Sequence, residues 1–172
     1  EVMKIAALGL VLDPQLGEAW LIVDRHMDVQ ARIGYRGLMK LAHQSGKVSA
    51  IYAHDVCEND VRKISLGTDK KLVHEPDFMK PRGKVGAYYA VVQYKDGGND
   101  FEIMSLDEVH AIRDRSDAYR AFKRGAIKST PWSTDEGEMG KKTPLRRLLK
   151  RVQMSPDLDR ALALEDEADA RD

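Results

Sequence analysis

The chain has 172 residues, 33% of them charged and 6% aromatic, which predicts one soluble domain large enough to enclose a hydrophobic core. The single Cys57 excludes an internal disulfide, and no apolar run reaches membrane-spanning length. No secretory signal is visible either, so we expect a cytoplasmic protein without a membrane partner.

The neutral total of 28 basic and 28 acidic residues conceals an uneven distribution. Residues 157–172 hold seven acids and two arginines, which leaves 26 bases against 21 acids in the first 156 residues. We therefore predict a core over residues 1–155 and an acidic C-terminal tail over residues 156–172. The tail has near-helical apolar spacing, so both a helix and a mobile extension remain open. The first residue is not Met, so we expect an N-terminal part to be missing from the core.

The first third of the sequence predicts a helix, a hairpin and a second helix. Glu1 to Leu12 has helical apolar spacing, and the strands Ala19–Val23 and Asp28–Ile33 flank a turn at Asp24–Met27. Val29, Ala31 and Ile33 would share one face of the second strand, with Gln30 and Arg32 on the other. Gly34 to Gly37 is expected to break the pattern before a helix over Leu38–Ser45, which Gly46 caps.

The middle of the chain predicts antiparallel strands. These are Val48–Cys57, Val61–Leu66, Lys71–His74, Gly86–Tyr94 and Phe101–Met104. Gly86–Tyr94 is the most apolar and is expected to be central. Gly97-Gly98 predicts the hairpin turn that follows it.

The last third predicts helices. Ser105 and Glu108 form a capping-box pattern that opens a helix through Lys123, with Val109, Ile112, Tyr119 and Phe122 as its buried stripe. Pro144 lies inside the next helical pattern, so we expect two segments that meet at Thr143, or a kink there. Strands followed by helices without βαβ alternation predict an α+β fold, in which an antiparallel hairpin and sheet pack against helices.

Cations are concentrated in the late helices. Residues 141–151 contain no acid and six cations: Lys141, Lys142, Arg146, Arg147, Lys150 and Arg151. Lys142, Arg146 and Lys150 are one helical turn apart and form a line that could follow a row of phosphates. A solvated helix face is the plainer interpretation. Trp132 fits either stacking on a base or anchoring a loop in the core.

The sequence offers no convincing catalytic constellation. It has no phosphate-binding loop for ATP, and its histidines lack ligand spacing. His54 with Asp55, Glu58 and Asp60 is the one arrangement that suggests a metal, and a strand end followed by a polar turn explains it better. We therefore expect a protein that is not an enzyme and requires no cofactor, with Mg²⁺ at most as a counterion.

Several stretches, in this order, resemble the RecT family of phage-type single-strand annealing proteins. They are Gln30–Gly46, Ile51–Asp60, Leu72–Pro76, Arg82–Val92, Lys95–Asp117 and Pro131–Val152, the last with W-x-x-D-x-x-x-M-x-x-K-T-x-x-R spacing. The resemblance implies ATP-independent binding of single-stranded DNA and annealing of complementary strands in homologous recombination. It also implies a bacterial or phage-infected host cell, a homo-oligomeric ring or helical filament, a partner exonuclease and the host single-strand-binding protein.

By this resemblance, basic helices line a groove for single-stranded and annealed duplex DNA. The implied DNA-binding residues are Gln30, Tyr35, Arg36, Gly37, Lys40, Arg113, Arg115, Trp132, Lys141, Lys142, Arg146 and Lys150. The acidic tail is hypothesised to repel DNA or to cap the groove of a neighbouring subunit. A metal-dependent nuclease at the Asp55–Asp60 turn and a protein-assembly module without DNA are the alternatives.

Overall fold

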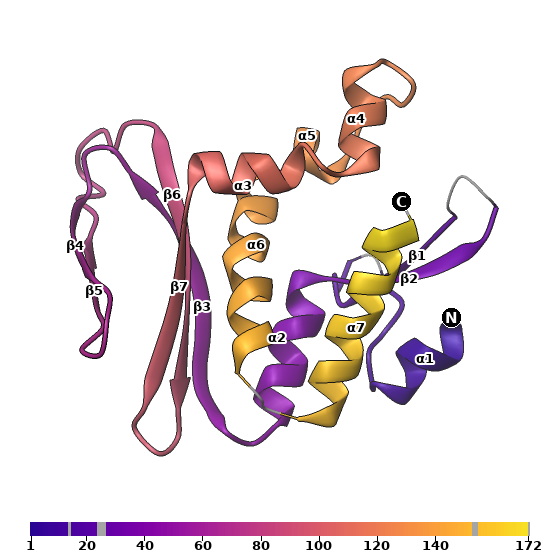
Figure 1. Ribbon diagram of the computed structural model, residues 1–172, viewed down its shortest axis with the longest axis horizontal. Coiled ribbons are helices and arrows are strands. Elements are labelled where there is room, and N and C mark those ends of the chain that lie inside the picture. The colour runs from indigo at the N-terminus through magenta and orange to yellow at the C-terminus, as the bar shows by residue number, and fades with distance from the viewer. Residues whose placement is uncertain (14, 24–26, 153–154, 172) are drawn as a thin grey trace.

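The computed structural model describes residues 1–172 except 14, 24–26, 153–154 and 172, and it combines helices with antiparallel sheets (Figure 1). The strands are β1 (Ala19–Val23), β2 (Val29–Ile33), β3 (Val48–Cys57), β4 (Val61–Ser65), β5 (Lys71–Glu75), β6 (Val85–Tyr94) and β7 (Asn99–Ser105). The helices are α1 (Val2–Ala7), α2 (Tyr35–Gln44), α3 (Leu106–Arg113), α4 (Asp117–Lys123), α5 (Pro131–Thr134), α6 (Glu136–Arg151) and α7 (Pro156–Arg171). The α+β prediction is confirmed. None of the described helices combines the length and apolarity needed to cross a bilayer.

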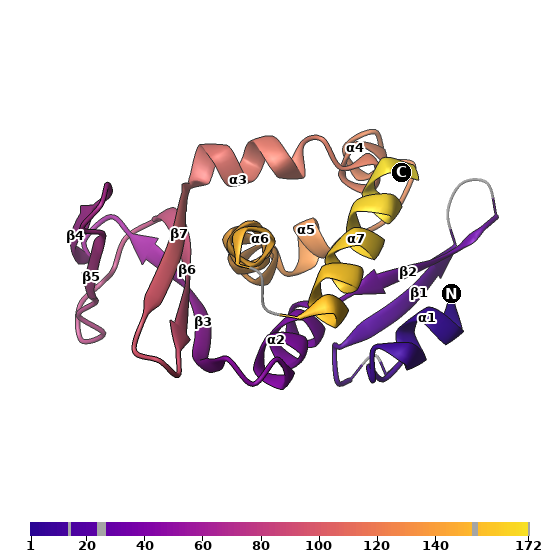
Figure 2. The same cartoon turned by 60° about the horizontal axis from the view of Figure 1, so that its bottom comes forward.

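The fold is layered around a three-stranded antiparallel sheet of order β3-β6-β7. Helices α6, α2 and α7 lie on one side of this sheet, and the β4–β5 hairpin lies on the other (Figures 1 and 2). The β1–β2 hairpin and α1 lie beyond α7, at the opposite end of the molecule from β4 and β5.

Strand β6 is central, as its apolar composition predicts. Its side chains alternate between two buried surfaces. Tyr88, Ala90 and Val92 belong to the clusters on the helical side, while Tyr89 and Val91 pack with Leu72 of β5 on the other side. Burial on both faces explains why this strand is an unbroken apolar run rather than an alternating one.

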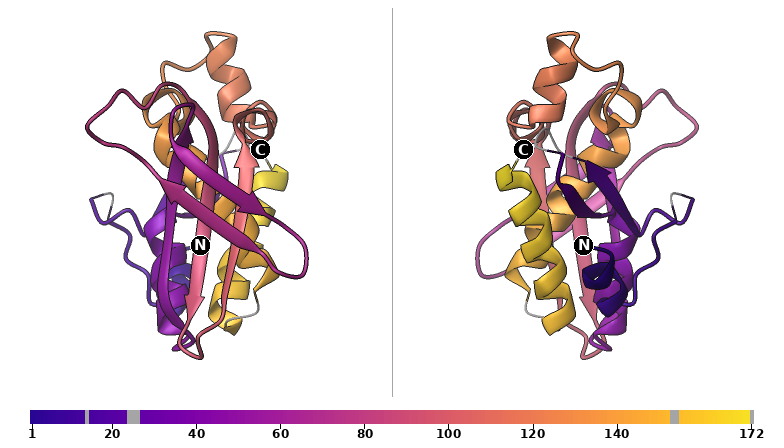
Figure 3. Two further views of the ribbon diagram at one scale, coloured as in Figure 1. Left: turned by 90° about the vertical axis from the view of Figure 1, so that its left-hand side faces the viewer. Right: turned by 90° about the vertical axis from the view of Figure 1, so that its right-hand side faces the viewer.

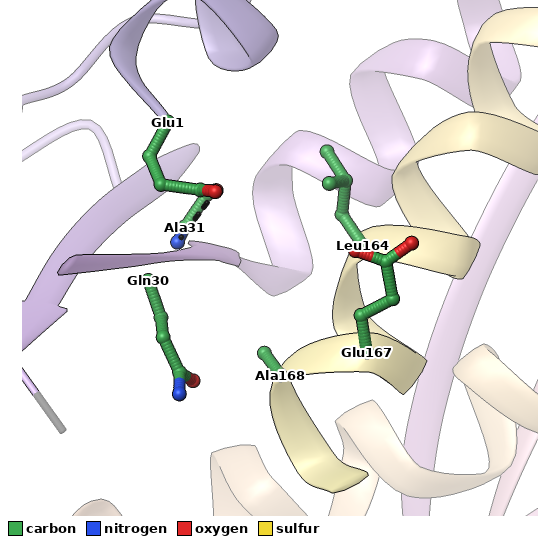
Figure 4. Close-up of a pocket in the computed structure, with 6 residues that line it drawn as sticks. All are labelled: Glu1, Gln30, Ala31, Leu164, Glu167 and Ala168. Atoms are coloured by element: carbon green, nitrogen blue, oxygen red, sulfur yellow. Dashed lines mark hydrogen bonds between the residues drawn. The ribbon is translucent and has the colours of Figure 1, made fainter. Parts of the chain in front are cut away.

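The β1–β2 hairpin is confirmed, with Ala19 opposite Ile33 and Val23 opposite Val29. Most of its predicted turn lies outside the described residues. The strand alternates as predicted, but burial does not follow residue polarity, because Val29 is 46% exposed and Gln30 only 3%. Gln30 lines a small cavity together with Leu164 and Ala168 of α7, so α7 covers the face that was expected to be polar (Figure 4). The volume of about 10 Å³ leaves room for no more than a water molecule.

Helix α2 begins at Tyr35, earlier than predicted, so the expected break at Tyr35-Arg36-Gly37 is the first turn of the helix. Gly37 is buried, and a Cβ there would lie 2.2 Å from the backbone oxygen of Glu18. The second glycine of this turn is therefore required by close packing against the start of the hairpin.

The single helix predicted over residues 105–123 is wrong. The capping box of Ser105 and Glu108 is present, but α3 ends at Arg113 and Ser116 caps a second helix, α4. Of the four residues predicted to be buried, only Val109 is: Ile112 of α3 is half-buried, and α4, which holds Tyr119 and Phe122, buries none of its residues. A serine that accepts from the backbone N–H three residues ahead competes with helix continuation, and here it prevails.

Helix α6 continues through Pro144, so the alternative of two segments that meet at Thr143 is wrong, and the alternative of a kink stays a prediction. Proline removes one helical hydrogen bond, at a cost of about 3 kcal/mol in a helix interior. Pro144, Leu145, Leu148 and Leu149 are all buried in this helix. Burial of three leucines offsets that cost, at about 1.5–3 kcal/mol each.

Residues 156–171 form α7, whose Leu158, Ala161 and Leu162 belong to the same core cluster as Ile33 and Leu145. The mobile alternative for the tail is therefore wrong for these residues. The domain boundary at residue 155 stays a prediction.

Substitutions at two glycines of α6 would measure the effect of close packing apart from the effect of helix propensity. A Cβ at Gly140 would lie 2.3 Å from Cζ of Tyr88, whereas a Cβ at Gly137 would meet nothing within 4 Å. We expect Gly140→Ala to lower the free energy of unfolding by about 1–3 kcal/mol through overpacking. Gly137→Ala should leave it unchanged or raise it by up to about 1 kcal/mol. Denaturant unfolding measures both, and equal effects would contradict the close packing of α6 on β6.

Candidate nucleic-acid interface

The predicted line of cations on α6 exists, and it faces α7. Lys142, Arg146 and Lys150 stand on successive turns, and each lies against a carboxylate of the C-terminal helix. The partners on α7 are Glu165, Asp166 and Asp169, so three cations meet three carboxylates.

Glu165 is the most buried member of this contact, with its side chain 1% exposed. One carboxylate oxygen accepts from the backbone N–H of Ile33 at 2.6 Å, and the other accepts from Nζ of Lys142 at 2.9 Å. Nζ of Lys142 also donates to the carbonyl of Ile33 at 3.0 Å. We call these three residues the Glu165 clasp, because they join the end of β2 to α6 and α7.

Arg146 lies beside the clasp and is shielded by carboxylates. Its Nη2 is 2.6 Å from Asp166, and its Nη1 is 2.6 Å from Asp169 and 3.8 Å from Glu165. Lys150 donates to the same Asp166 oxygen at 2.6 Å. Partial burial opposes ionisation of Asp166, but the hydrogen bonds from Lys150 and Arg146 hold its pKa below the usual value.

The remaining cations of α6 are also paired. Lys141 contacts Glu138, one turn earlier on the same helix. Arg147 and Arg151 both contact Glu102 of β7, at 3.1 and 2.8 Å. Every cation between residues 141 and 151 therefore has a carboxylate within 4.0 Å.

The predicted residues of β2 and α2 differ in their exposure to solvent. Arg36 is exposed on the first turn of α2, and Tyr35 beside it is half-buried, which raises the pKa of its phenol. Gly37 and Gln30 are buried. Nζ of Lys40 donates to Glu18 at 2.8 Å and to the carbonyl of Gly9 at 2.9 Å, so it holds the segment before β1.

The predicted residues Arg113, Arg115 and Trp132 belong to α3, to the residues after it and to α5. Arg113 donates to Asp114 and to Glu136, both at 2.9 Å, and its guanidinium lies 4.6 Å from the ring centroid of Tyr119. Arg115 is exposed, and its Nε donates to the carbonyl of Ala111. Trp132 is 7% exposed and packs with Tyr88, Met104 and Val109, so the geometry favours the core-anchor interpretation.

These positions come from α6, from the start of α2 and from the end of α3. The line on α6 faces α7, the exposed Arg36 is on α2, and Arg115 follows α3. The role of all twelve residues in DNA binding stays a prediction. The carboxylates of α7 were missed as partners, although Asp166 and Asp169 are spaced one turn apart, as are the cations they contact.

The turn at Asp55–Asp60 gives the nuclease alternative no support. Asp60 is buried, and it accepts from Arg82, from His74 and from the backbone N–H of Cys57. The hydrogen bonds from Arg82 hold the pKa of Asp60 well below its usual value despite burial. Within the described ranges, no group of three or more His, Cys, Asp and Glu side chains is arranged to hold a metal ion.

The sequence of the chain matches a known protein family. A family model described as the RecT family matches residues 2–172. The chain belongs to the RecT family. It is 34% identical over 172 aligned residues to Protein RecT of Escherichia coli (strain K12), covering 96% of this chain and 61% of that protein. It is also 26% identical over 170 residues to the uncharacterized protein YqaK of Bacillus subtilis (strain 168), covering 98% of this chain and 56% of that protein.

The chain thus spans about three fifths of the length of these curated relatives. The RecT-family match includes α7, so the helix that neutralises α6 lies within the region shared with the family. The family resemblance inferred from the sequence motifs is confirmed.

The buried position of Trp132 leads to a direct test. We expect Trp132→Ala to lower the free energy of unfolding by about 3–5 kcal/mol, because it empties a cluster beneath β6. Trp20→Ala should cost less, since that ring is 37% exposed. Thermal melting compares the two, and an unchanged melting temperature for Trp132→Ala together with lost DNA binding would favour base stacking instead.

Proposed function

We propose that this chain binds single-stranded DNA and anneals complementary strands during homologous recombination, without ATP and without making or breaking covalent bonds. The observation that carries the proposal is the RecT-family match over residues 2–172. The sequence contains no phosphate-binding loop that would indicate ATP use.

Annealing is a physical rather than a chemical task. Two polyanions must approach, so cations have to neutralise their phosphates. Once register is found, base stacking stabilises the duplex by about 1.4 kcal/mol per step. The protein therefore needs a cationic surface that holds a strand with its bases accessible, and Mg²⁺ would serve only as a counterion.

In this proposal, the line of cations on α6 binds DNA, but the carboxylates of α7 already contact these cations. Carboxylate oxygens of Asp166 and Asp169 contact Arg146 and Lys150 at the distances that phosphate oxygens would take. Both aspartates are 51% exposed, whereas Glu165 is 1% exposed. A strand would compete with the two aspartates and leave the Glu165 clasp intact.

Assembly and partners belong to the same proposal. A homo-oligomer, as a ring or helical filament, would repeat one weak strand contact many times and so increase the total affinity. A partner exonuclease would supply single strands, and a host single-strand-binding protein would cover them. The family membership supports these partners, and each is open to a pull-down with the full chain.

Complementary labelled oligonucleotides mixed with the protein in the absence of nucleotide triphosphate test the function. We expect faster annealing than without protein, no change on adding ATP, and intact strands after incubation with Mg²⁺. Particle size recorded in the same mixture reports assembly. Unchanged annealing rates would contradict the proposal, and cleaved strands would favour the nuclease alternative.

Competition between α7 and DNA predicts a gain of affinity. We expect Asp166→Asn with Asp169→Asn to tighten binding of single-stranded DNA several-fold, because Arg146 and Lys150 lose competing carboxylates. Both aspartates are 51% exposed, but the Arg146 side chain is only 19% exposed, so melting temperatures are recorded to confirm that the variant folds.

The matched control is Asp157→Asn with Asp159→Asn, which removes the same charge from the first turn of α7. Asp157 pairs with Arg160 of its own helix rather than with α6. Fluorescence anisotropy with a labelled oligonucleotide measures both variants. Equal gains would show that only net charge matters and would remove the α6 line from the proposal.

A further inference from the structure

Residues 115–128 form a strongly basic segment that the site described above does not include, apart from Arg115. It consists of α4 and its flanks, and we call it the α4 arm. The α4 arm has one acid, Asp117, and five cations: Arg115, Arg120, Lys123, Arg124 and Lys128. Its net charge of +4 within 14 residues contrasts with the neutral whole chain.

Burial of side chains does not explain the position of this segment. Helix α4 buries none of its residues and projects beyond the rest of the molecule, as three directions of view show (Figures 1 and 3). Its aromatic residues Tyr119 and Phe122 are only half-buried, with ring centroids 6.1 Å apart. The α4 arm therefore contributes little to the core.

Ion pairing distinguishes the α4 arm from α6. Every cation of α6 from residue 141 onward has a carboxylate within 4.0 Å, as described above. On the α4 arm, Arg120 pairs with Asp117, and Lys123 is near enough to Asp114 to interact with it electrostatically. Among the described residues, Lys123, Arg124 and Lys128 have no carboxylate within 4.0 Å. All three are exposed.

The spacing of these cations is also suited to a polyanion. Arg120, Lys123 and Arg124 are three and four residues apart, which places them on one face of α4 and its last turn. Like charges so close together repel one another, and a row of phosphates relieves this repulsion. An exposed cationic face on a projecting element is readily reached by a long, flexible strand.

We propose that the α4 arm binds the phosphate backbone of single-stranded nucleic acid and makes the first contact with it. This assignment rests on the proposed function and adds Arg120, Lys123, Arg124 and Lys128 to the binding surface. The α4 arm is available in the structure as it stands, whereas the α6 line becomes available only when a strand displaces the aspartates of α7.

The test variant is Lys123→Gln, Arg124→Gln, Lys128→Gln in the full chain. The matched control is Lys63→Gln, Lys84→Gln, Lys95→Gln, which removes three exposed lysines from β4 and from the loops around β6. Anisotropy of a labelled oligothymidine is measured from 0.05 to 0.5 M salt, and melting temperatures confirm that both variants fold.

For three lost phosphate contacts, we expect the plot of log affinity against log salt to become shallower by about 2, which corresponds to roughly 100-fold weaker binding at 0.1 M salt. The control should retain the wild-type slope. An unlabelled abasic phosphodiester strand should displace the oligothymidine from the wild type, while polyglutamate of equal charge should not.

An arm variant with the wild-type slope would overturn the assignment of the α4 arm, and annealing by the same variant would leave the proposed function standing. Absence of DNA binding by the wild type would overturn both. Displacement by polyglutamate as efficient as by the abasic strand would also overturn the assignment, because it would indicate an acidic protein partner.

Discussion

The arrangement of the helices depends on one buried carboxylate. Glu165 reaches from α7 to the backbone N–H of Ile33 and to Lys142, whose ammonium group is also bonded to the carbonyl of Ile33. Removing one partner from a buried pair of this kind costs about 3–5 kcal/mol, because the other charge is left without compensation. The apolar residues Leu158, Ala161 and Leu162 dock α7 in the same core cluster as Leu145, Leu148 and Leu149 of α6. The Glu165 clasp adds to the register set by this packing, since a shift of one turn would separate Glu165 from Lys142.

With α7 in this register, its other carboxylates lie beside cations of α6 and β2. Asp166 and Asp169 follow Glu165 by one and four residues and are themselves half-exposed. They meet Lys150, which is 43% exposed, and Arg146 and Arg32, which are 19% and 14% exposed. The carboxylate of Glu165 is buried, whereas those of Asp166 and Asp169 are half-exposed, so salt and competing anions reach the two aspartates more readily. The same helix thus contains a permanent attachment and a set of pairs that exchange with solvent.

The sequence predicted the elements better than their surroundings. Strand bounds such as Ala19–Val23 and Val48–Cys57 match, because period-two patterns and turn residues are local signals. Helix continuity at Pro144 and the burial of Gln30 were missed, because both depend on contacts with segments distant in the chain. For the candidate site, the spacing of Lys142, Arg146 and Lys150 was correct. Their pairing with acids up to 23 residues away was not foreseen, since a charge run does not reveal its partner.

Because of this pairing, a run of cations in the sequence does not by itself indicate a positively charged surface. Six cations without an acid between residues 141 and 151 suggest a strong positive field, yet ion pairs with α7, β7 and α6 itself cancel most of it. Among the described residues, α4 and its flanks hold three exposed cations, Lys123, Arg124 and Lys128, for which no ion pair within 4.0 Å is found. A carboxylate of the same chain is held near its cation, so its effective concentration there is high. A DNA strand in solution must compete with that effective concentration before it can displace the carboxylate. A strand already held on the α4 arm competes from close range, so the order of contacts proposed above follows from the difference in pairing between two basic helices.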